Sequence, residues 1–221
     1  MTLQSIRVDG PHRGQPVRMG GEPIERAKAA MLMVHGRGAR AEDILSLADE
    51  LAQPGFAYVA PQAAENTWYP NRFLAPIPSN EPWLSSALAF VGGVFDQIVE
   101  RGIQPARIIL LGFSQGACLT MEYAARNARS YGGVVGLSGG LIGPDDTPRD
   151  YKGSLEGTPV FLGCSDVDFH VPKERVGQTA EVFRRLGGEV TERLYPNMEH
   201  TINQDEINFV REMMRTLVPG I

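Results

Sequence analysis

Ser114 is the residue of this 221-residue chain whose setting points most directly to chemistry. It stands in the middle of Gly112-Phe-Ser-Gln-Gly116, the G-x-S-x-G pattern of a nucleophile elbow, in which a strained strand-to-helix turn lifts a serine hydroxyl above the end of a sheet. Apolar residues typical of a buried strand precede the motif at 107–111, and a helical pattern follows it without a loop. The glycines suit positions where a side chain would collide with the tight turn. This context favours a nucleophile over the alternative, a purely structural turn.

A serine hydroxyl is a poor nucleophile at neutral pH and needs an adjacent base, which histidine most often provides. Of the four histidines, His200 follows the last expected strand and precedes the last expected helix. Reactive groups of a parallel sheet gather at such strand ends, so we expect His200 to be the general base. His12 is expected to be a solvated loop residue, and His35 ends the first core strand. His170 lies two residues from Asp168, too close in sequence to be the partner of that carboxylate.

A carboxylate must orient the base, and the segment 163–172 can supply one because it follows the penultimate expected strand. It offers Asp166 and Asp168, and the pattern alone leaves the choice between them open. With either one, serine, aspartate and histidine follow one another along the chain in that order.

Acyl transfer also needs hydrogen-bond donors aimed at the developing oxyanion. The backbone N–H of Gln115 is one candidate, since Gln115 opens the helix after the elbow and gains from that helix's dipole. The second candidate is the backbone N–H of Arg37, because Gly36 and Gly38 on either side allow a tight turn. The alternative is that His35-Gly-Arg-Gly38 is only a turn at a strand end.

The elements that must position these residues alternate between strand and helix from residue 29 to the end. Short apolar runs predict strands, and apolar residues at helical spacing predict helices. Such alternation is typical of a parallel sheet with helices on both faces, an α/β fold, and we expect one domain over residues 1–221. Two strand-like pieces at 4–8 and 17–19 are expected to form an edge hairpin. The predicted strands are 29–34, 56–60, 107–111, 132–137, 158–163 and 189–195; the predicted helices are 42–53, 82–101, 115–129, 172–186 and 203–217.

The segment 61–82 has no regular pattern but carries Trp68, Tyr69 and Phe73. Long loops in a compact domain are usually functional, and aromatic side chains on them are candidates for pocket walls. Together with Leu141, which follows another strand end, these three are the expected substrate-binding residues. The alternative is that they pack against neighbouring loops.

Composition excludes several other classes of function. Hydrophobic residues make up 43% of the chain and the net charge is -5, so a nucleic-acid partner is not expected. No apolar run reaches the ~18 to 20 residues that cross a bilayer, and the first ten residues lack a signal-peptide layout. The two cysteines, Cys118 and Cys164, fit free thiols of a cytoplasmic protein. Neither a metal nor another cofactor is expected.

The chain resembles the phospholipase/carboxylesterase family of α/β hydrolases, which includes acyl-protein thioesterases and small bacterial carboxylesterases. The resemblance rests on His35-Gly-Arg-Gly38, Gly112-Phe-Ser-Gln-Gly-Ala117, Asp168-Phe-His-Val-Pro172 and His200. It implies an α/β-hydrolase fold without a cap domain, and many members of the family are homodimers.

The resemblance also implies roles for single residues. In this family the elbow serine, here Ser114, is the nucleophile and the histidine of the final loop, here His200, is the base. The acid is the aspartate of D-x-x-V-P, which selects Asp168. The oxyanion donors fall on the backbone of Arg37 and Gln115.

The chain departs from the acyl-protein thioesterases in two places. They usually have Gly-Leu-Gly-Asp after the strand-end histidine, whereas Gly36-Arg-Gly-Ala39 stands here, and the loop with Trp68-Tyr-Pro70 also differs. Both departures favour small-molecule esters over palmitoylated proteins as substrates.

We therefore predict a serine carboxylesterase that hydrolyses carboxylic esters, with thioesters and lysophospholipid esters also in view, through an acyl-enzyme intermediate. Two alternatives stay open: a lactone or phosphotriester hydrolase similar to dienelactone hydrolase, and a non-catalytic binding protein on the same fold. Dienelactone-hydrolase relatives place a cysteine at the elbow, but Ser114 holds that position here. Cys118, one helical turn further on, is expected to be a buried structural residue.

Overall fold

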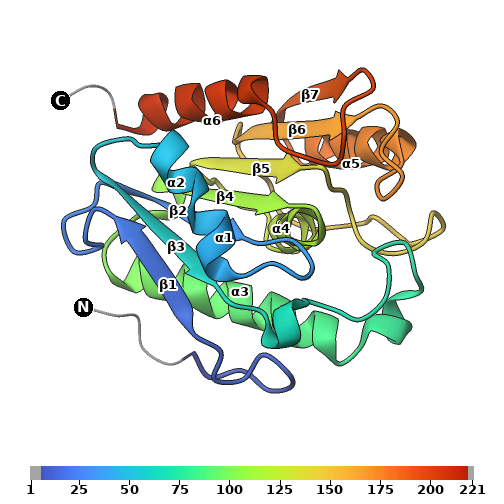
Figure 1. The fold of residues 1–221 in the computed structure, drawn as a ribbon, viewed down its shortest axis with the longest axis horizontal. Coiled ribbons are helices and arrows are strands. Elements are labelled where there is room, and N and C mark those ends of the chain that lie inside the picture. Colours follow the sequence, from blue (N-terminus) through green and yellow to red (C-terminus); the bar gives the residue numbers. More distant parts are fainter. Residues whose placement is uncertain (1–5, 219–221) are drawn as a thin grey trace.

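The structure is a computed structural model and describes residues 6–218. Its centre is one seven-stranded sheet with the strand order β1-β3-β2-β4-β5-β6-β7. All neighbouring pairs run parallel except β1 and β3, which pair antiparallel at one edge. Figure 1 shows this twisted sheet with helices on both of its faces. The strands are β1 (Val17–Gly21), β2 (Ala29–Val34), β3 (Phe56–Pro61), β4 (Ile108–Phe113), β5 (Gly133–Leu137), β6 (Pro159–Ser165) and β7 (Glu189–Tyr195).

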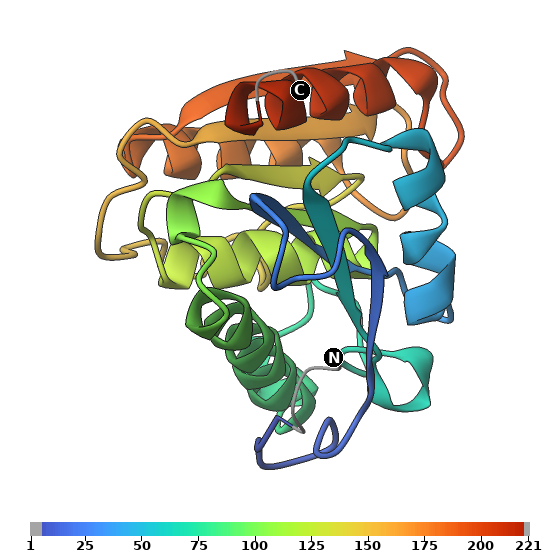
Figure 2. The same ribbon diagram turned by 90° about the vertical axis from the view of Figure 1, so that its left-hand side faces the viewer.

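The helices are divided between the faces by the alternation of side chains along the strands. In β2, Ala30, Leu32 and Val34 pack toward one hydrophobic cluster, and Ala29, Met31 and Met33 pack toward the other. The first cluster contains α3, α4 and α5, and the second contains α1 and α6; Figure 2 shows the same layering from the side. The helices are α1 (Ala41–Leu45), α2 (Leu47–Glu50), α3 (Trp83–Glu100), α4 (Gln115–Arg126), α5 (Lys173–Arg185) and α6 (Gln204–Leu217), with short 3-10 turns η1 (Ala64–Asn66), η2 (Ile77–Asn80) and η3 (Pro105–Arg107).

The expected α/β-hydrolase architecture is confirmed, and no separate cap domain interrupts residues 6–218. Two local predictions were wrong. The expected helix 42–53 is broken at Ser46 into α1 and α2, and it ends at Glu50. The expected edge hairpin is not formed within residues 6–218, because β1 pairs with β3 and residues 6–8 are not in a strand; residues 4 and 5 of the predicted first strand lie outside the described part.

Among residues 6–218, no helix is both long and apolar enough to span a bilayer.

Candidate active site

Ser114 occupies a strained turn between β4 and α4. Its backbone has φ 55° and ψ -120°, a combination that is costly for a residue with a Cβ. Gly112 and Gly116 make the turn possible: a Cβ on Gly112 would collide with the backbone of Gly116, and a Cβ on Gly116 would collide with the carbonyl of Val34. The backbone is anchored on the other side, where Ser114 N donates to Leu137 O at 2.9 Å. The elbow predicted from the motif is therefore present, with the glycines where the turn has no room for side chains.

The structure brings Ser114, His200 and Asp168 together from three separate strand ends. Nε2 of His200 lies 2.8 Å from the Ser114 hydroxyl, and Nδ1 of His200 lies 2.6 Å from Asp168 Oδ2. This geometry suits an imidazole that donates its Nδ1–H to the carboxylate and accepts the serine O–H at Nε2. The Asp168 side chain is fully buried and that of His200 is 16% exposed, so the chain of hydrogen bonds is shielded from water except near the serine.

Asp168 is held as an acceptor by three donors. Its Oδ1 accepts the backbone N–H groups of His170 at 2.8 Å and Val171 at 3.0 Å, while Oδ2 faces His200. Burial raises the pKa of Asp168, but the hydrogen bonds from His200 and from the two backbone N–H groups more than offset this, so the pKa lies below its ordinary value. Asp166, the alternative acid, instead accepts the backbone N–H of Asn197 at 2.8 Å and fastens the loop that carries His200.

The two cysteines are both free and buried. Burial raises the pKa of the Cys118 thiol to about 12, which fits the structural role expected of it and not a nucleophile. Cys164, for which the sequence suggested no role, lies at the end of β6 with its Sγ 3.8 Å from Asp168 Oδ2. Burial also raises the pKa of the Cys164 thiol to about 12, with the neighbouring Asp168 acting in the same direction, so the thiol stays protonated and faces the carboxylate as a weak donor.

Arg37 and Gln115, whose backbone N–H groups are the predicted oxyanion donors, line the same cavity as the serine. The loop after β2 packs directly on the elbow, since a Cβ on Gly36 would lie 3.4 Å from Ser114 Cβ. Gly38 has φ 78°, and the turn closes with Ala39 N donating to Gly36 O at 3.3 Å. Within residues 6–218, neither the Arg37 N–H nor the Gln115 N–H makes a hydrogen bond. Two backbone donors without a partner among residues 6–218 therefore belong to residues that line the same cavity as the nucleophile.

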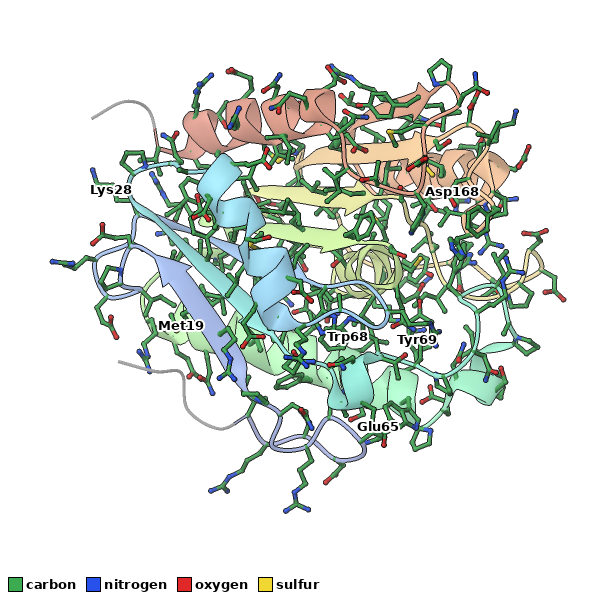
Figure 3. All side chains as sticks on the ribbon, viewed as in Figure 1. Met19, Lys28, Glu65, Trp68, Tyr69 and Asp168 are labelled. Carbon is green, nitrogen blue, oxygen red and sulfur yellow. The ribbon has the colours of Figure 1, made fainter. Side chains whose placement is uncertain are left out.

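The side chains of the same two residues hold the aromatic loop in place. Gln115 Oε1 accepts the backbone N–H of Trp68 at 2.9 Å, and its Nε2 donates to Tyr69 O at 2.8 Å. The Arg37 guanidinium donates to Pro70 O at 2.8 Å and to Asn71 O at 2.6 Å. Figure 3 labels Trp68 and Tyr69 on this loop, and Asp168 after β6. The long loop is thus tied, residue by residue, to the elbow and to the loop after β2.

A cavity of about 640 Å³ opens beside Ser114 and His200. Tyr69 and Phe73, two of the residues predicted for the substrate pocket, line this cavity. Trp68 and Leu141 are corrections to the predicted pocket: both are buried in the hydrophobic core. The Trp68 indole donates to His35 O at 2.8 Å, so its ring supports the loop from beneath. The cavity is lined by Gly36, Arg37, Ala39, Tyr69, Pro70, Asn71, Arg72, Phe73, Phe113, Ser114, Gln115, Cys118, His170, Val171 and His200.

The expectation that His12 is solvated was wrong. Its side chain is fully buried, with Nδ1 accepting the backbone N–H of Ala64 at 3.1 Å and Nε2 lying 3.0 Å from Trp68 O. Burial lowers the pKa of His12, because a charged imidazole would be desolvated there. His12 thus braces both ends of the segment that leads into the aromatic loop.

Two basic cavity residues, His170 and Arg72, were not among the predicted site residues. The His170 ring packs edge-on against the His200 ring, with centroids 4.9 Å apart. Arg72 lies between loop residues already selected for their aromatic character. The sequence could have indicated His170, since it lies inside the D-x-x-V-P stretch that supplies the acid. No sequence pattern indicated Arg72.

A mostly parallel sheet flanked by helices, with a strained serine elbow at the carboxyl end of a central strand, defines the α/β-hydrolase class. Within that class, the chain belongs to the phospholipase/carboxylesterase family, whose model matches residues 21–218.

Individual relatives agree with this family. The chain is similar to a phospholipase/carboxylesterase of Dyadobacter fermentans in a solved structure, with 44% identity, a TM-score of 0.88, and coverage of 90% of this chain and 96% of that one. It is 31% identical over 135 residues to acyl-protein thioesterase 1 of Gibberella zeae, covering 57% of this chain and 54% of that protein. It is 28% identical over 158 residues to lysophospholipase-like protein 1 of Mus musculus, covering 70% of this chain and 66% of that protein. The matched region thus spans less than two thirds of either curated relative.

Proposed function

We propose that this protein is a serine esterase that hydrolyses carboxylic esters, including thioesters, through an acyl-enzyme intermediate. The observation that carries the proposal is the chain of hydrogen bonds from Ser114 Oγ through His200 to Asp168, 2.8 and 2.6 Å long, on a strained elbow at the edge of an open cavity. The names of the relatives, an acyl-protein thioesterase and a phospholipase/carboxylesterase, support the same class of reaction.

In the first half of the proposed reaction, Ser114 Oγ attacks the ester carbonyl carbon while His200 Nε2 takes the serine proton. The electron pair of the carbonyl moves onto its oxygen, and the N–H groups of Arg37 and Gln115 stabilise that oxyanion. Asp168 stays ionised and stabilises the imidazolium. When the tetrahedral intermediate collapses, the bond to the leaving alkoxide or thiolate breaks, and His200 returns its proton to that group.

The second half repeats these steps with water as the nucleophile. His200 takes a proton from water as the hydroxide attacks the acyl-enzyme carbonyl, and the bond to Ser114 then breaks. The proton returns to Ser114 Oγ, the carboxylic acid leaves, and the enzyme is restored. The side chains of Arg37 and Gln115 are both hydrogen-bonded to the loop that carries Tyr69 and Pro70, which supports an oxyanion site organised before substrate arrives.

The test is covalent labelling by a fluorophosphonate probe, followed by turnover of ester substrates. Wild-type protein is expected to label, and Ser114→Ala is expected to lose labelling and about 10⁴- to 10⁶-fold in kcat. Ser138→Ala is a matched control, because Ser138 also ends a strand with a positive φ of 54° but lies one strand away. It should label normally. Labelling that survives in Ser114→Ala would reject the nucleophile, and an unlabelled wild type would reject the serine esterase.

The cavity and the family favour small-molecule esters over the two alternatives, lactone or phosphotriester hydrolysis and a non-catalytic binding protein. Assays of p-nitrophenyl esters of increasing acyl length, run beside assays of simple lactones, distinguish the proposed esterase from a lactone hydrolase. Saturable turnover of the esters with lactones at least ten times slower (by kcat/KM, order of magnitude) is the expected result. Faster lactone turnover would favour the dienelactone-hydrolase-like reaction.

We further infer one domain over residues 1–221, a cytoplasmic location, no nucleic-acid partner, and a homodimer. The single sheet supports one domain, and the buried free thiols of Cys118 and Cys164 support a cytoplasmic location. The net charge of -5 argues against a nucleic-acid partner. The homodimer is inferred because many members of the family are homodimers. Light scattering on the purified chain measures the mass of the assembly, and a monomer at micromolar concentration would reject the dimer.

A further inference from the structure

We propose that the cavity beside Ser114 selects esters that carry a negatively charged group, a carboxylate or a phosphate, on the part of the substrate that reaches the cavity rim. This deepens the proposed function and rests on it. The inference comes from the charges that line the cavity and from how each of them is, or is not, paired.

The ionisable side chains on the cavity wall include two that are cationic at any working pH, Arg37 and Arg72, and two histidines, His170 and His200. No aspartate or glutamate lines the cavity among residues 6–218. The acid of the site, Asp168, does not line the cavity; its side chain is fully buried and hydrogen-bonded to His200. A chain with a net charge of -5 therefore presents a positive wall at its site, a contrast that would draw an anionic substrate toward the cavity.

The hydrogen-bond partners of the Arg37 guanidinium are neutral backbone carbonyls. Its two terminal nitrogens donate to the carbonyls of Pro70 and Asn71, and no carboxylate pairs with it within the described part of the chain. The two hydrogen bonds also fix the guanidinium in one place, so little side-chain entropy is lost when it meets an anion.

Arg72 is the freer of the two cations. It is exposed, lines the cavity, and its guanidinium makes no hydrogen bond or ion pair with any residue in the range 6–218. Its backbone is held, since Arg72 O accepts the side-chain N–H of Asn80 at 3.3 Å. A guanidinium can bind a carboxylate or a phosphate with two parallel hydrogen bonds, and no group among residues 6–218 occupies these donors of Arg72.

Arg175, behind the same wall, shows the opposite arrangement. Its guanidinium stands 5.9 Å over the Phe73 ring, pairs with Asp145 at 2.6 Å, and donates to the carbonyls of Leu141 and Gly143. That buried arginine is a structural group with its charge matched. Arg175 thus has a carboxylate partner, whereas Arg37 and Arg72 face the cavity without one among residues 6–218.

The expected preference is moderate because both arginines are exposed and water screens their charge. We expect kcat/KM for an anionic ester to exceed that for its neutral isostere by about 3- to 10-fold at low salt. Raising NaCl from about 0.02 M to about 0.5 M should shrink that ratio toward one, because the Debye length falls from roughly 20 Å to roughly 4 Å.

The test compares monoethyl adipate with ethyl adipamate, which differ only in a terminal carboxylate or amide, with ethanol release as the readout. An ester with a terminal phosphate of similar length, ethyl 5-phosphonooxypentanoate, forms a third arm and separates carboxylate from phosphate recognition. Arg72→Gln should bring the anionic-to-neutral ratio to about 2 or below, and Arg72→Lys should keep most of it. Arg13→Gln is the matched control, since it changes the net charge equally from an exposed position outside the cavity lining.

A ratio of one or less in the wild type would overturn the proposal, and so would a ratio that Arg72→Gln and Arg13→Gln leave equally unchanged. Turnover of the neutral amide ester together with fluorophosphonate labelling would then show that the esterase itself stands. Loss of turnover of all three esters without labelling would instead reject the proposed function.

Discussion

Tyr69 pairs a buried ring with a hydroxyl that no nitrogen or oxygen of residues 6–218 satisfies. Its hydroxyl lies beside the Cys118 thiol, a weak partner, and burial raises the pKa of Tyr69 well above the ordinary value. A buried hydroxyl without a strong partner costs free energy. We therefore predict that Tyr69→Phe raises the free energy of unfolding by about 1 kcal/mol, measured by urea denaturation.

Tyr58→Phe is the control for that prediction. The Tyr58 hydroxyl donates to Leu51 O at 3.0 Å and accepts the backbone N–H of Gln53 at 3.3 Å, so its removal should lower the free energy of unfolding by about 1 kcal/mol. Each substitution removes one hydroxyl oxygen. Changes of opposite sign in the free energy of unfolding would show that the effect depends on whether the hydroxyl is hydrogen-bonded and not on the loss of packing. A loss of stability in Tyr69→Phe would show that the hydroxyl has a partner worth more than its desolvation.

Asp168 and Asp166 lie two residues apart and invite a second matched comparison. Asp168→Asn removes the charge that stabilises the His200 imidazolium and favours the wrong tautomer, so kcat is expected to fall by about 10³- to 10⁴-fold. Asp166→Asn keeps an oxygen that can accept the Asn197 N–H, and should cost less than about 10-fold. Steady-state kinetics on one neutral ester decides, and equal losses would mean that the acid is misassigned.

At the scale of elements, the elbow depends on the close approach of α4 to the strands. Gly116→Ala would place a Cβ against the carbonyl of Val34, and we expect at least about 2 kcal/mol of destabilisation together with loss of activity. Gly177, inside α5, meets only Glu192 Oε1 at 3.7 Å. Gly177→Ala should therefore raise the free energy of unfolding by about 0.5 to 1 kcal/mol, through the better helix propensity of alanine. Thermal melts of both variants test this, and a tolerated Gly116→Ala would mean that the elbow can shift.

The same scale shows what the sequence could predict. The strand β2 is a short, continuous apolar run and the edge strand β7 alternates polar and apolar residues, so both were placed at the right residues. The elbow was recognised with its strand and helix. The sequence did not predict the break between α1 and α2 at Ser46, because apolar residues at helical spacing continue on both sides of it. The pairing of β1 with β3 and the burial of His12 both depend on contacts made across many residues of chain, which no local pattern records. Trp68 and Tyr69 are neighbours on one loop, and the sequence predicted the same pocket-lining role for both. Only contacts with distant residues decide that Trp68 packs in the core and that Tyr69 lines the cavity.

At the scale of the whole molecule, stability against pH combines groups whose pKa values shift in opposite directions. His12 and His35 have pKa values lowered by burial, so their contribution is lost as the pH falls below about 6.5. The pKa of Asp168 is lowered, so its contribution to the free energy of unfolding is lost only as the pH falls below 3.8.

Glu206 shifts the pH dependence of stability in the opposite direction. It is fully buried in α6 behind the acid loop, its Oε2 accepts the Asn203 N–H at 2.9 Å, and its Oε1 has no hydrogen-bond partner among the described residues.

Burial raises the pKa of Glu206 from 4.5 to about 7, so between these values the folded state holds a proton that the unfolded state has released. Stability should therefore be lost from this group as the pH rises from 4.5 to about 7, by up to about 3 kcal/mol. The glutamine of Glu206→Gln does not titrate. The free energy of unfolding of this variant, relative to that of the wild type, should therefore increase by that amount between pH 4.5 and about pH 8. The contributions of the two histidines are the same in both proteins and cancel in this difference. Asp205→Asn, its exposed neighbour with a lowered pKa, should show no such gain. Urea denaturation across this range measures the difference. A difference that does not change with pH would mean that the pKa of Glu206 is the same in the folded and unfolded states, with its second oxygen solvated in the folded protein.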